Sequence, residues 1–536
     1  MKSGKILLLS VVLVIISNAV AITIGYAALS IPVPAGQESF PAYGPIASPV
    51  ISAAPVQAMP IGLGPVASGG DTMSIQVGIA PFSVPVDIYF GFLAPSIDPK
   101  NIYLLTSNDT LMPLPVSGPL RVKPAPWIIN ASGGANALLG NIPVASLPAG
   151  TYTFFLLVTP AGSLDSYYLW ATAVDVANNV LPITVNGALC SADSYLNKPC
   201  VNVTVCTPGT SDCQTISDIL LDTGSYGLRI FSQVLTVSLP QAATGSDSLA
   251  ECIQFGDGSS EWGPVKMASV ILGNEPAVQI PIHVIDSTFG SLPRACRNAE
   301  QSPASAGFNG ILGVGLFIRD CGAACANSAQ NGMYYACTGT QCGGTAVDLS
   351  AQVQNPVAFL PEDNNGVIVH LPSVPPGGLP AVNGSLVLGI GTQFNNSPSG
   401  VTAYPANKFG EFTTTFNGIL YNSFIDTGSN GLFFPPPSAS LLPDCSGPNS
   451  DWFCPSSTIG FSAINTGASG SPSGMASFLI GNLVSLTGSS NRVFSEIGGN
   501  SLGDFEWGLP FLFGRNISVG LEGSSSILGT GPYWAY

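Results

Sequence analysis

Residues 219–228 read Ile-Leu-Leu-Asp-Thr-Gly-Ser-Tyr-Gly-Leu, and residues 423–432 read Ser-Phe-Ile-Asp-Thr-Gly-Ser-Asn-Gly-Leu. From the aspartate onward six of seven positions are identical, and Asp222 and Asp426 lie 204 residues apart. This interval is far longer than the period of a solenoid repeat. The repeat therefore predicts two related lobes, each contributing one copy of the same loop.

Each copy predicts a tight turn between two buried strands. Apolar residues flank the Asp-Thr-Gly-Ser sequence on both sides, and Gly224 and Gly428 permit the backbone angles that a tight turn needs. An aspartate enclosed by buried strands is costly unless it has a partner. We therefore expect Asp222 and Asp426 to face each other.

Two carboxyl groups in such a position can hydrolyse a peptide bond. Close like charges cannot both ionise easily, so one carboxyl keeps its proton, as is known for aspartic proteases. The ionised carboxylate would act as general base on a water, and the protonated one would polarise the scissile carbonyl. The hydroxyls of Thr223, Ser225, Thr427 and Ser429 are expected to hold the carboxylates in plane.

The twin Asp-Thr-Gly-Ser pattern resembles the pepsin-like and retropepsin-like aspartic peptidases over residues 180–536. The short x-Gly-Leu continuation is closer to the retroviral-type loop than to pepsin itself. The pattern also resembles a bacterial family known only as a domain of unknown function. The pepsin resemblance implies that Asp222 and Asp426 are catalytic. It gives supporting roles to the loop residues Thr223, Gly224, Ser225, Thr427, Gly428 and Ser429.

The resemblance also implies a flap that closes over the substrate. Residues 254–260, Gln-Phe-Gly-Asp-Gly-Ser-Ser, follow the first copy in the right order, and Phe255, Gly256 and Asp257 are the expected flap residues. Gly-Asp-Gly is typical of a hairpin tip whatever its role, so a plain hairpin is the alternative. The family usually has Tyr in the flap. Phe255 lacks that hydroxyl, and Trp262 could supply an indole N–H instead.

Behind each loop the resemblance implies a crossing strand that ends in glycine. Residues 308–313, Phe-Asn-Gly-Ile-Leu-Gly, match the first such strand, and residues 507–512, Trp-Gly-Leu-Pro-Phe-Leu, match the second. Glu506 stands where an apolar residue is usual. Residues 384–389 resemble the strand that opens the second lobe.

Composition indicates a mostly β protein. Only 8% of residues are charged and 46% are hydrophobic, with 62 Gly and 46 Pro, which fits many short strands joined by turns. The formal charge of −16 excludes a nucleic-acid binder, which needs cations against phosphates. Plain solubility explains the acidity best, and adaptation to low pH is an alternative.

The N-terminal part divides by composition into three segments. Residues 1–30 predict a signal peptide or a membrane anchor, because Lys2 and Lys5 precede an apolar run and Ala-Val-Ala at 19–21 offers a cleavage site. Residues 31–70 are a Pro/Gly/Ala/Ser-rich linker. Residues 71–176 show alternating strands separated by turns and predict a β-sandwich of the immunoglobulin type.

All 12 cysteines lie at or after Cys190, and an even number in an exported chain predicts disulfides. The short spacings at 321–325 and 337–342 could suit zinc, but only two histidines exist and neither is near, so disulfides are favoured over metal. Cys445 and Cys454 are the easiest local pair, and the remaining connectivity is left open.

Other candidate residues are few. A Ser/His or Cys/His centre would need His283 or His370, and both lie in apolar runs that predict strands. Arg229 follows the first loop closely. A surface salt bridge is the favoured interpretation for Arg229, and a substrate contact is the alternative.

The sequence thus predicts a mostly β chain: an N-terminal β-sandwich, then a two-lobed pepsin-like acid-protease fold with lobes at 180–375 and 376–536. The expected function is that of an aspartic-type endopeptidase that is secreted, periplasmic or on the cell surface. We expect a monomer with a polypeptide substrate and no cofactor, metal or nucleic acid. Membrane contact would come only through an N-terminal anchor. The alternative is a catalytically inactive binding protein of the cell envelope with the same fold.

Overall fold

The computed structural model describes residues 85–116, 125–131, 135–143, 150–162 and 168–536, apart from 96, 109, 192, 193, 394 and 502. Three further strands are described by their backbone: β1 (Val20–Ala21), β2 (Gln57–Ala58) and β3 (Thr72–Ile79). The predicted signal or anchor segment and the linker otherwise lie outside the described residues. The chain divides into two compact units, residues 1–178 and 179–536.

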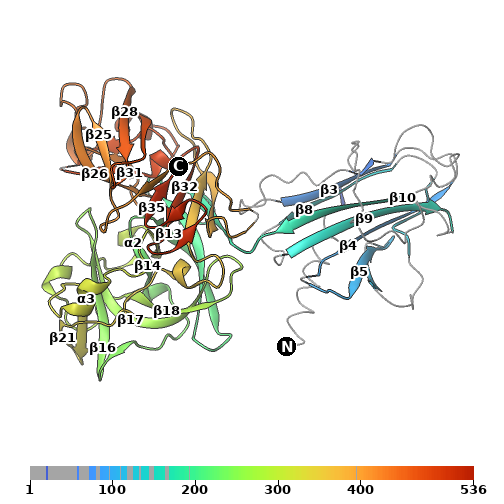
Figure 1. Ribbon diagram of the computed structural model, residues 1–536, viewed down its shortest axis with the longest axis horizontal. Helices are drawn as coiled ribbons and strands as arrows, with labels where there is room; N and C mark the ends of the chain where they lie inside the picture. The colour runs from blue at the N-terminus through green and yellow to red at the C-terminus, as the bar shows by residue number, and fades with distance from the viewer. Residues whose placement is uncertain are drawn as a thin grey trace. The chain divides into compact units, whose positions relative to one another are not determined.

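The N-terminal unit contains two antiparallel sheets (Figure 1). One has the strand order β1-β8-β3-β2, and the other has the order β10-β9-β4-β5-β6 with β7 paired to β4. The additional strands are β4 (Val86–Leu93), β5 (Asn101–Leu105), β6 (Leu111–Pro115), β7 (Ile128–Ala131), β8 (Ala135–Pro143), β9 (Gly150–Pro160) and β10 (Tyr168–Val176). The alternating or apolar runs of the sequence predicted β3, β4, β5, β9 and β10, whereas β6, β7 and β8 were not predicted.

The second unit is built around one long sheet with the order β21-β20-β16-β17-β18-β14-β19-β13-β12-β11-β23-β22-β32-β35-β24, with β15 paired to β16. Its strands are β11 (Val180–Val185), β12 (Pro199–Cys206), β13 (Cys213–Asp222), β14 (Tyr226–Phe231), β15 (Ala243–Thr244), β16 (Asp247–Gln254), β17 (Ser260–Ile271), β18 (Val278–Ile285), β19 (Gly310–Val314), β20 (Tyr334–Thr338), β21 (Gln341–Gly344), β22 (Gly366–Leu371), β23 (Val382–Leu388), β24 (Ala403–Pro405), β32 (Arg515–Gly520) and β35 (Tyr533–Ala535). The expectation of a mostly β fold is confirmed.

A smaller sheet of the second unit has the order β29-β28-β25-β26-β31-β27-β30. Its strands are β25 (Phe412–Phe416), β26 (Ile419–Asp426), β27 (Leu432–Phe433), β28 (Ile459–Thr466), β29 (Ser473–Ile480), β30 (Gly498–Gly499) and β31 (Phe505–Gly508). Two short strands pair separately, β33 (Ser525–Ser526) and β34 (Gly529–Thr530). The α-helices of the described residues are short: α2 (Pro303–Ala306), α3 (Ala323–Asn327), α4 (Leu483–Thr487) and α5 (Leu509–Leu512).

The two sheets repeat one arrangement of four strands. In the long sheet the neighbours run β18-β14-β19-β13, and in the smaller sheet they run β30-β27-β31-β26. In both, the outer pairs are parallel and the middle pair is antiparallel. The repeat in the sequence therefore corresponds to a repeat in strand pairing.

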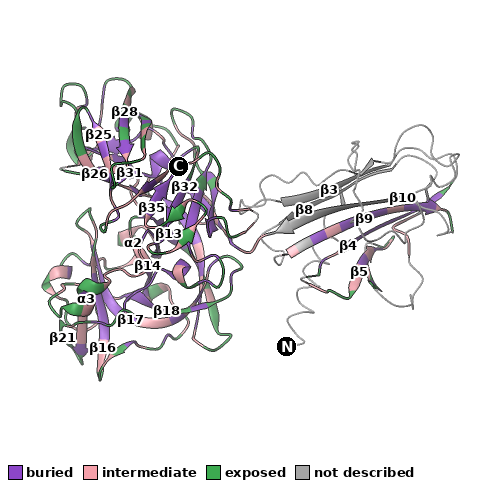
Figure 2. Cartoon of the chain, in the orientation of Figure 1, coloured by how far each residue is buried: buried purple, intermediate pink, exposed green. Residues whose placement is uncertain are grey.

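Buried residues, purple in Figure 2, run along many of these strands, and most of them are apolar. The part of the core under the smaller sheet is aromatic: Phe434 packs against Phe505 with ring centroids 5.0 Å apart, and Phe505 lies 4.6 Å from Trp507. Aromatic pairs at these distances add to the free energy gained from burial. The core is continuous from β11 to Trp534 and includes residues of both sheets.

Six disulfides join all 12 cysteines. The pairs are Cys190–Cys200, Cys206–Cys213, Cys252–Cys296, Cys321–Cys325, Cys337–Cys342 and Cys445–Cys454. The predicted pairing of Cys445 with Cys454 is confirmed. The disulfides indicate an oxidising, extracytoplasmic location. In the part of the chain that the structure describes, no helix is long and apolar enough to cross a bilayer.

Arg229 corrects one expectation, because it does not form a surface salt bridge. Its side chain is fully buried, and its guanidinium lies 3.1 Å from Glu251 and 3.2 Å from Asp320. His283 approaches Glu251 at 3.4 Å. A guanidinium in this position needs hydrogen-bonded carboxylates because water cannot reach it. Arg229 is therefore part of the core and does not lie on the surface.

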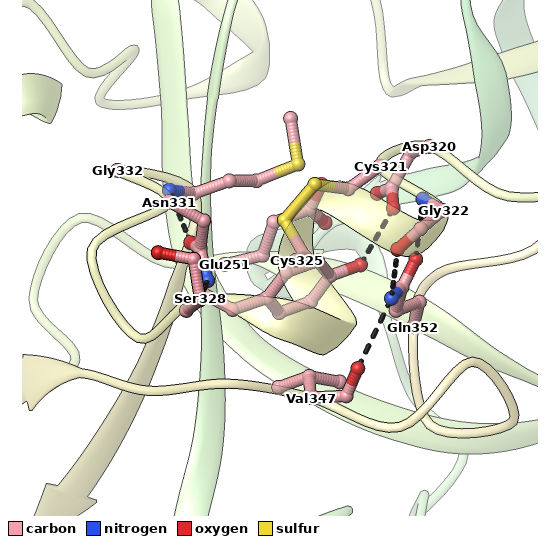
Figure 3. The surroundings of a disulfide bond; sticks show 12 residues. Glu251, Asp320, Cys321, Gly322, Cys325, Ser328, Asn331, Gly332, Val347 and Gln352 are labelled. Atoms are coloured by element: carbon pink, nitrogen blue, oxygen red, sulfur yellow. Dashed lines mark hydrogen bonds between the residues drawn. A yellow bond between two sulfur atoms is a disulfide. The ribbon is translucent and has the colours of Figure 1, made fainter.

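The loop that carries Asp320 is closed by the Cys321–Cys325 disulfide (Figure 3). The Gln352 side chain accepts a hydrogen bond from the Gly322 amide at 2.7 Å and donates to the Gly322 carbonyl at 2.8 Å. Tyr334 donates its hydroxyl to Asp320 at 2.7 Å. These contacts fix the carboxylate of Asp320 beside the buried guanidinium.

Arg229 acts on three buried carboxyl groups, those of Glu251, Asp320 and Glu261, and their pKa values move in different directions. Burial raises the pKa of Glu251, but Arg229, His283 and the hydrogen bonds to its carboxylate together bring that pKa below its usual range. Burial and the charge of Glu251 raise the pKa of Asp320 well above its usual range. Burial also raises the pKa of Glu261 to about 8. These shifts favour the ionised form of Glu251 beside Arg229, and they favour a proton on Asp320 and on Glu261.

Replacing Arg229 with leucine should destabilise the protein strongly. Arg229→Leu leaves Glu251 as a buried, unpaired charge, which costs about 3–5 kcal/mol. Urea unfolding followed by fluorescence measures the loss. Arg297→Leu, at an exposed arginine, is the control and should change stability by less than about 0.5 kcal/mol. Equal effects of the two changes would contradict the assignment.

Candidate active site

The two aspartates end matching strands. Asp222 is the last residue of β13 and pairs with Gly313 of the parallel strand β19, while Asp426 ends β26 and pairs with Gly508 of the parallel strand β31. A Cβ on Gly508 would lie 2.0 Å from the Gly431 carbonyl oxygen, so the position accepts only glycine. The first crossing strand, predicted at 308–313, is β19 (Gly310–Val314), whereas in the second predicted stretch, 507–512, only the first two residues belong to β31 and the rest form α5.

Crossed hydrogen bonds between Thr223 and Thr427 hold the two loops together. Thr223 Oγ1 donates to the Ile425 carbonyl at 2.9 Å and accepts the Thr427 amide at 3.0 Å. Thr427 Oγ1 donates to the Leu221 carbonyl at 2.7 Å and accepts the Thr223 amide at 3.0 Å. Both side chains are buried. The threonine hydroxyls were expected to hold the carboxylates in plane, but they bind the backbone of the opposite loop instead.

The serines and glycines contact the carboxylates. Ser429 Oγ donates to Asp426 Oδ2 at 2.8 Å, and Ser225 Oγ makes the matching short contact with Asp222 Oδ2. The Gly224 amide lies 2.7 Å from Asp222 Oδ1 and 3.2 Å from Asp426 Oδ1. A single donor thus reaches both aspartates, which brings the two carboxyl groups together as expected.

The close approach explains both loop glycines. A Cβ on Gly224 would lie 2.7 Å from Cγ of Asp426. A Cβ on Gly428 would lie 3.0 Å from Oδ1 of Asp222. Neither glycine has a positive φ, so these positions need glycine for space and not for backbone conformation.

Burial and mutual repulsion keep protons on the pair. The pKa of Asp222 is raised well above its usual range, first by burial and then by the charge of Asp426. Burial, followed by the charge of Glu506, raises the pKa of Asp426 to about 6. Two coupled carboxyls lose their protons in steps that belong to the pair. Over an interval of pH the pair therefore holds one proton.

This region of the chain is shared with other proteins. The family model described as "Protein of unknown function (DUF3443)" matches residues 175–536. The chain belongs to the DUF3443 family. The expected resemblance to a family of unknown function is thereby confirmed. The matched DUF3443 region contains both aspartate loops and all six disulfides. No curated protein matches the chain.

The predicted flap of the DUF3443 region is a hairpin of β16 and β17. The Phe255 amide donates to the Ser259 carbonyl at 3.0 Å, and Asp257 accepts the Ser259 hydroxyl at 2.6 Å. Phe255 is half-buried, while Gly256 and Asp257 are exposed. Among the described hydrogen bonds, none joins residues 255–257 to either aspartate. Their role toward a substrate stays a prediction.

Trp262 does not supply a hydrogen-bond donor to the flap tip. Its side chain is fully buried, and its indole N–H donates to the Phe289 carbonyl at 2.7 Å. The two histidines are strand residues as expected: His283 lies in β18 and His370 in β22.

Three residues near the loops were not assigned a role from the sequence. Glu506 shares Ser429 with Asp426, because Ser429 Oγ also makes a short contact with Glu506 Oε1. Tyr195 donates to the Gly428 carbonyl at 3.3 Å, and Asn197 donates to the Asn430 carbonyl at 2.8 Å. Glu506 was noticeable as a charged residue in an apolar position. Tyr195 and Asn197 lie far from the loop in sequence and carried no signal.

Replacing either loop threonine with valine should weaken the contact between the loops. Thr427→Val removes the donor to Leu221 and leaves the buried Thr223 amide without its acceptor, at a cost of about 2–3 kcal/mol. Thermal and urea unfolding measure the loss. Thr427→Ser keeps the hydroxyl and should recover most of the stability.

The control for this change lies on the same strand as Asp222. Thr215 is exposed, and its hydroxyl bonds only to the Thr204 side chain, at 2.7 Å. Thr215→Val should therefore cost less than about 0.5 kcal/mol. If Thr427→Val were no more harmful than Thr215→Val, the crossed bonds would not hold the loops.

Proposed function

We propose that the DUF3443 region of this chain is an aspartic-type endopeptidase with Asp222 and Asp426 as its catalytic pair. The observation that carries the proposal is the shared Gly224 amide, which lies within hydrogen-bond reach of Oδ1 of both aspartates. Two carboxyl groups this close can hold one proton and one water between them. The matching serine contacts on each carboxyl support the same assignment.

The pair would hydrolyse a peptide bond in two steps. In the first, the ionised carboxylate takes a proton from water while the water oxygen attaches to the peptide carbon. The protonated carboxyl gives its proton to the carbonyl oxygen. In the second, the tetrahedral diol collapses and the C–N bond breaks. The carboxyl that took a proton from water gives it to the leaving amine nitrogen, and the other carboxylate takes a proton back from a diol hydroxyl. Both carboxyls return to their starting protonation.

The pKa shifts of the two aspartates support a division of these roles. Burial and the charge of Asp426 raise the pKa of Asp222 well above its usual range, whereas the pKa of Asp426 is raised to about 6, so we take Asp222 as the group that keeps the shared proton. Asp426 then acts as general base. The substrate would be a polypeptide in an extracytoplasmic compartment, which agrees with the six disulfides.

Changing either aspartate to asparagine should abolish cleavage of a denatured polypeptide. Asp222→Asn removes the acid and Asp426→Asn removes the base, so each should lower the rate at least about a hundredfold. The assay follows new termini by mass spectrometry, and a statine-type transition-state mimic should inhibit it. Asp212→Asn, at an exposed aspartate before β13, is the matched control and should keep full activity.

Two outcomes would overturn the proposal in different ways. Cleavage that survives both active-site changes would mean another site or a contaminant. Absence of cleavage in the unmodified protein, with the mimic still bound at these aspartates, would favour the alternative of an inactive binding protein.

The rate should depend on pH with two limbs. It should rise as Asp426 ionises, at a pH of about 6, because the general base then forms. It should fall at higher pH, where Asp222 loses its proton and the acid is lost. These shifts favour a less acidic optimum than the shared-proton mechanism alone implies. A rate that is flat from pH 4 to 8 would contradict the assignment.

A further inference from the structure

Glu506 gives the second loop a carboxyl group that the first loop lacks. The parallel register of β26 and β31 places Glu506 two residues before Gly508, and the matching position before Gly313 in β19 is Ile311. Ser225 therefore contacts only Asp222, whereas Ser429 contacts both Asp426 and Glu506. The two copies of the loop differ at this one carboxyl.

The serine cannot satisfy both acids. A hydroxyl has one hydrogen to donate, so Ser429 can donate to Asp426 or to Glu506 but not to both. If it donates to Glu506, the contact with Asp426 needs a hydrogen from the Asp426 carboxyl. A pair of hydrogen bonds in which Asp426 donates to Ser429 and Ser429 donates to an ionised Glu506 thus favours the protonated form of Asp426.

The surroundings of Glu506 leave its charge unbalanced. Phe424 and Phe433 lie opposite Glu506 on the neighbouring strands β26 and β27. The charged groups that act on it are Asp426, Asp222 and Asp504, all acidic. Among the ion pairs of the described residues, none reaches Glu506.

Glu506 and Asp426 are both half-buried, while Asp222 is 6% exposed. Burial raises the pKa of Glu506, and the charge of Glu506 in turn raises the pKa of Asp426. A negative charge on Glu506 therefore opposes the ionisation of Asp426.

We propose that Glu506 is a positioning residue that moves the pH range in which the aspartate pair is active toward neutral pH. It does so by accepting the hydrogen bond of Ser429 and by placing a negative charge beside Asp426. The inference rests on the proposed peptidase function for its effect on rate. Its effect on proton binding does not depend on catalysis. Glu506 acts on Asp426 through Ser429 and through its charge.

The test compares the pH–rate profiles of three variants. Glu506→Gln removes the charge and lets Ser429 donate to Asp426, and Glu506→Ile copies the first loop. Both should move the ascending limb to lower pH, and a shift of one unit means about tenfold faster cleavage on the acid side of the profile. Glu506→Asp keeps the charge and should stay close to the unmodified profile. A purely structural role would lower the rate at every pH without moving the limb, which would overturn the inference.

A second measurement tests Glu506 without catalysis. A carboxyl whose pKa is raised by folding stabilises the protein at low pH, and that stability is lost as pH rises through the raised value. Glu506→Gln removes two such shifts, its own and part of that of Asp426. The variant should therefore gain in unfolding free energy relative to the unmodified protein as pH rises from 4 to 7.

The outcomes separate the two proposals. Asp348→Asn, at an exposed aspartate, is the control and should show no growth of the difference over this range. If no cleavage is found at any pH but the stability difference of Glu506→Gln grows as expected, the peptidase function fails and the role of Glu506 in proton binding stands. A constant stability difference for Glu506→Gln would overturn the inference whatever the activity.

Discussion

The hydrogen bonds between Thr223 and Thr427 are the constraint on which the rest of the site depends. They join two loops that lie 204 residues apart, and they use hydroxyls and amides that are buried away from water. Each side chain satisfies the backbone of the other loop, so neither loop can keep its conformation alone without unpaired buried groups. The close contact of two acidic groups, which repel when ionised, is possible because these neutral bonds hold their loops in place.

The two copies reach the same backbone geometry with different interiors. The first is surrounded by disulfides and by the buried Arg229 with its carboxylates, while the second packs Phe434, Phe505 and Trp507 under its sheet. The strand pairing around the loops is nevertheless the same. The pairing is set by the glycines that let the crossing strands approach, and many side-chain combinations can fill the space behind them. Differences between the copies are therefore free to adjust the chemistry of each aspartate.

The site was predictable from sequence wherever local residues alone determine the structure. The aspartate loops and the glycines of the crossing strands have strict local requirements, and those parts were found. The role of the threonines was not, because it depends on which backbone lies opposite. Arg229 was misplaced on the surface for the same kind of reason, since Glu251 and Asp320 approach it only in the folded chain. Glu506 was noticed as an exception, but its contact with Ser429 depends on the register of β26 and β31.

The disulfides close short stretches of chain. The longest spans 44 residues, from Cys252 to Cys296, and each of the others spans 10 or fewer. None links one aspartate loop to the other. Five of the six pairs precede Asp426 in the sequence, so their oxidation can finish before the second loop has been translocated, while Cys445 and Cys454 follow that loop. The acidic pair can then be completed on a first lobe whose disulfides are already closed.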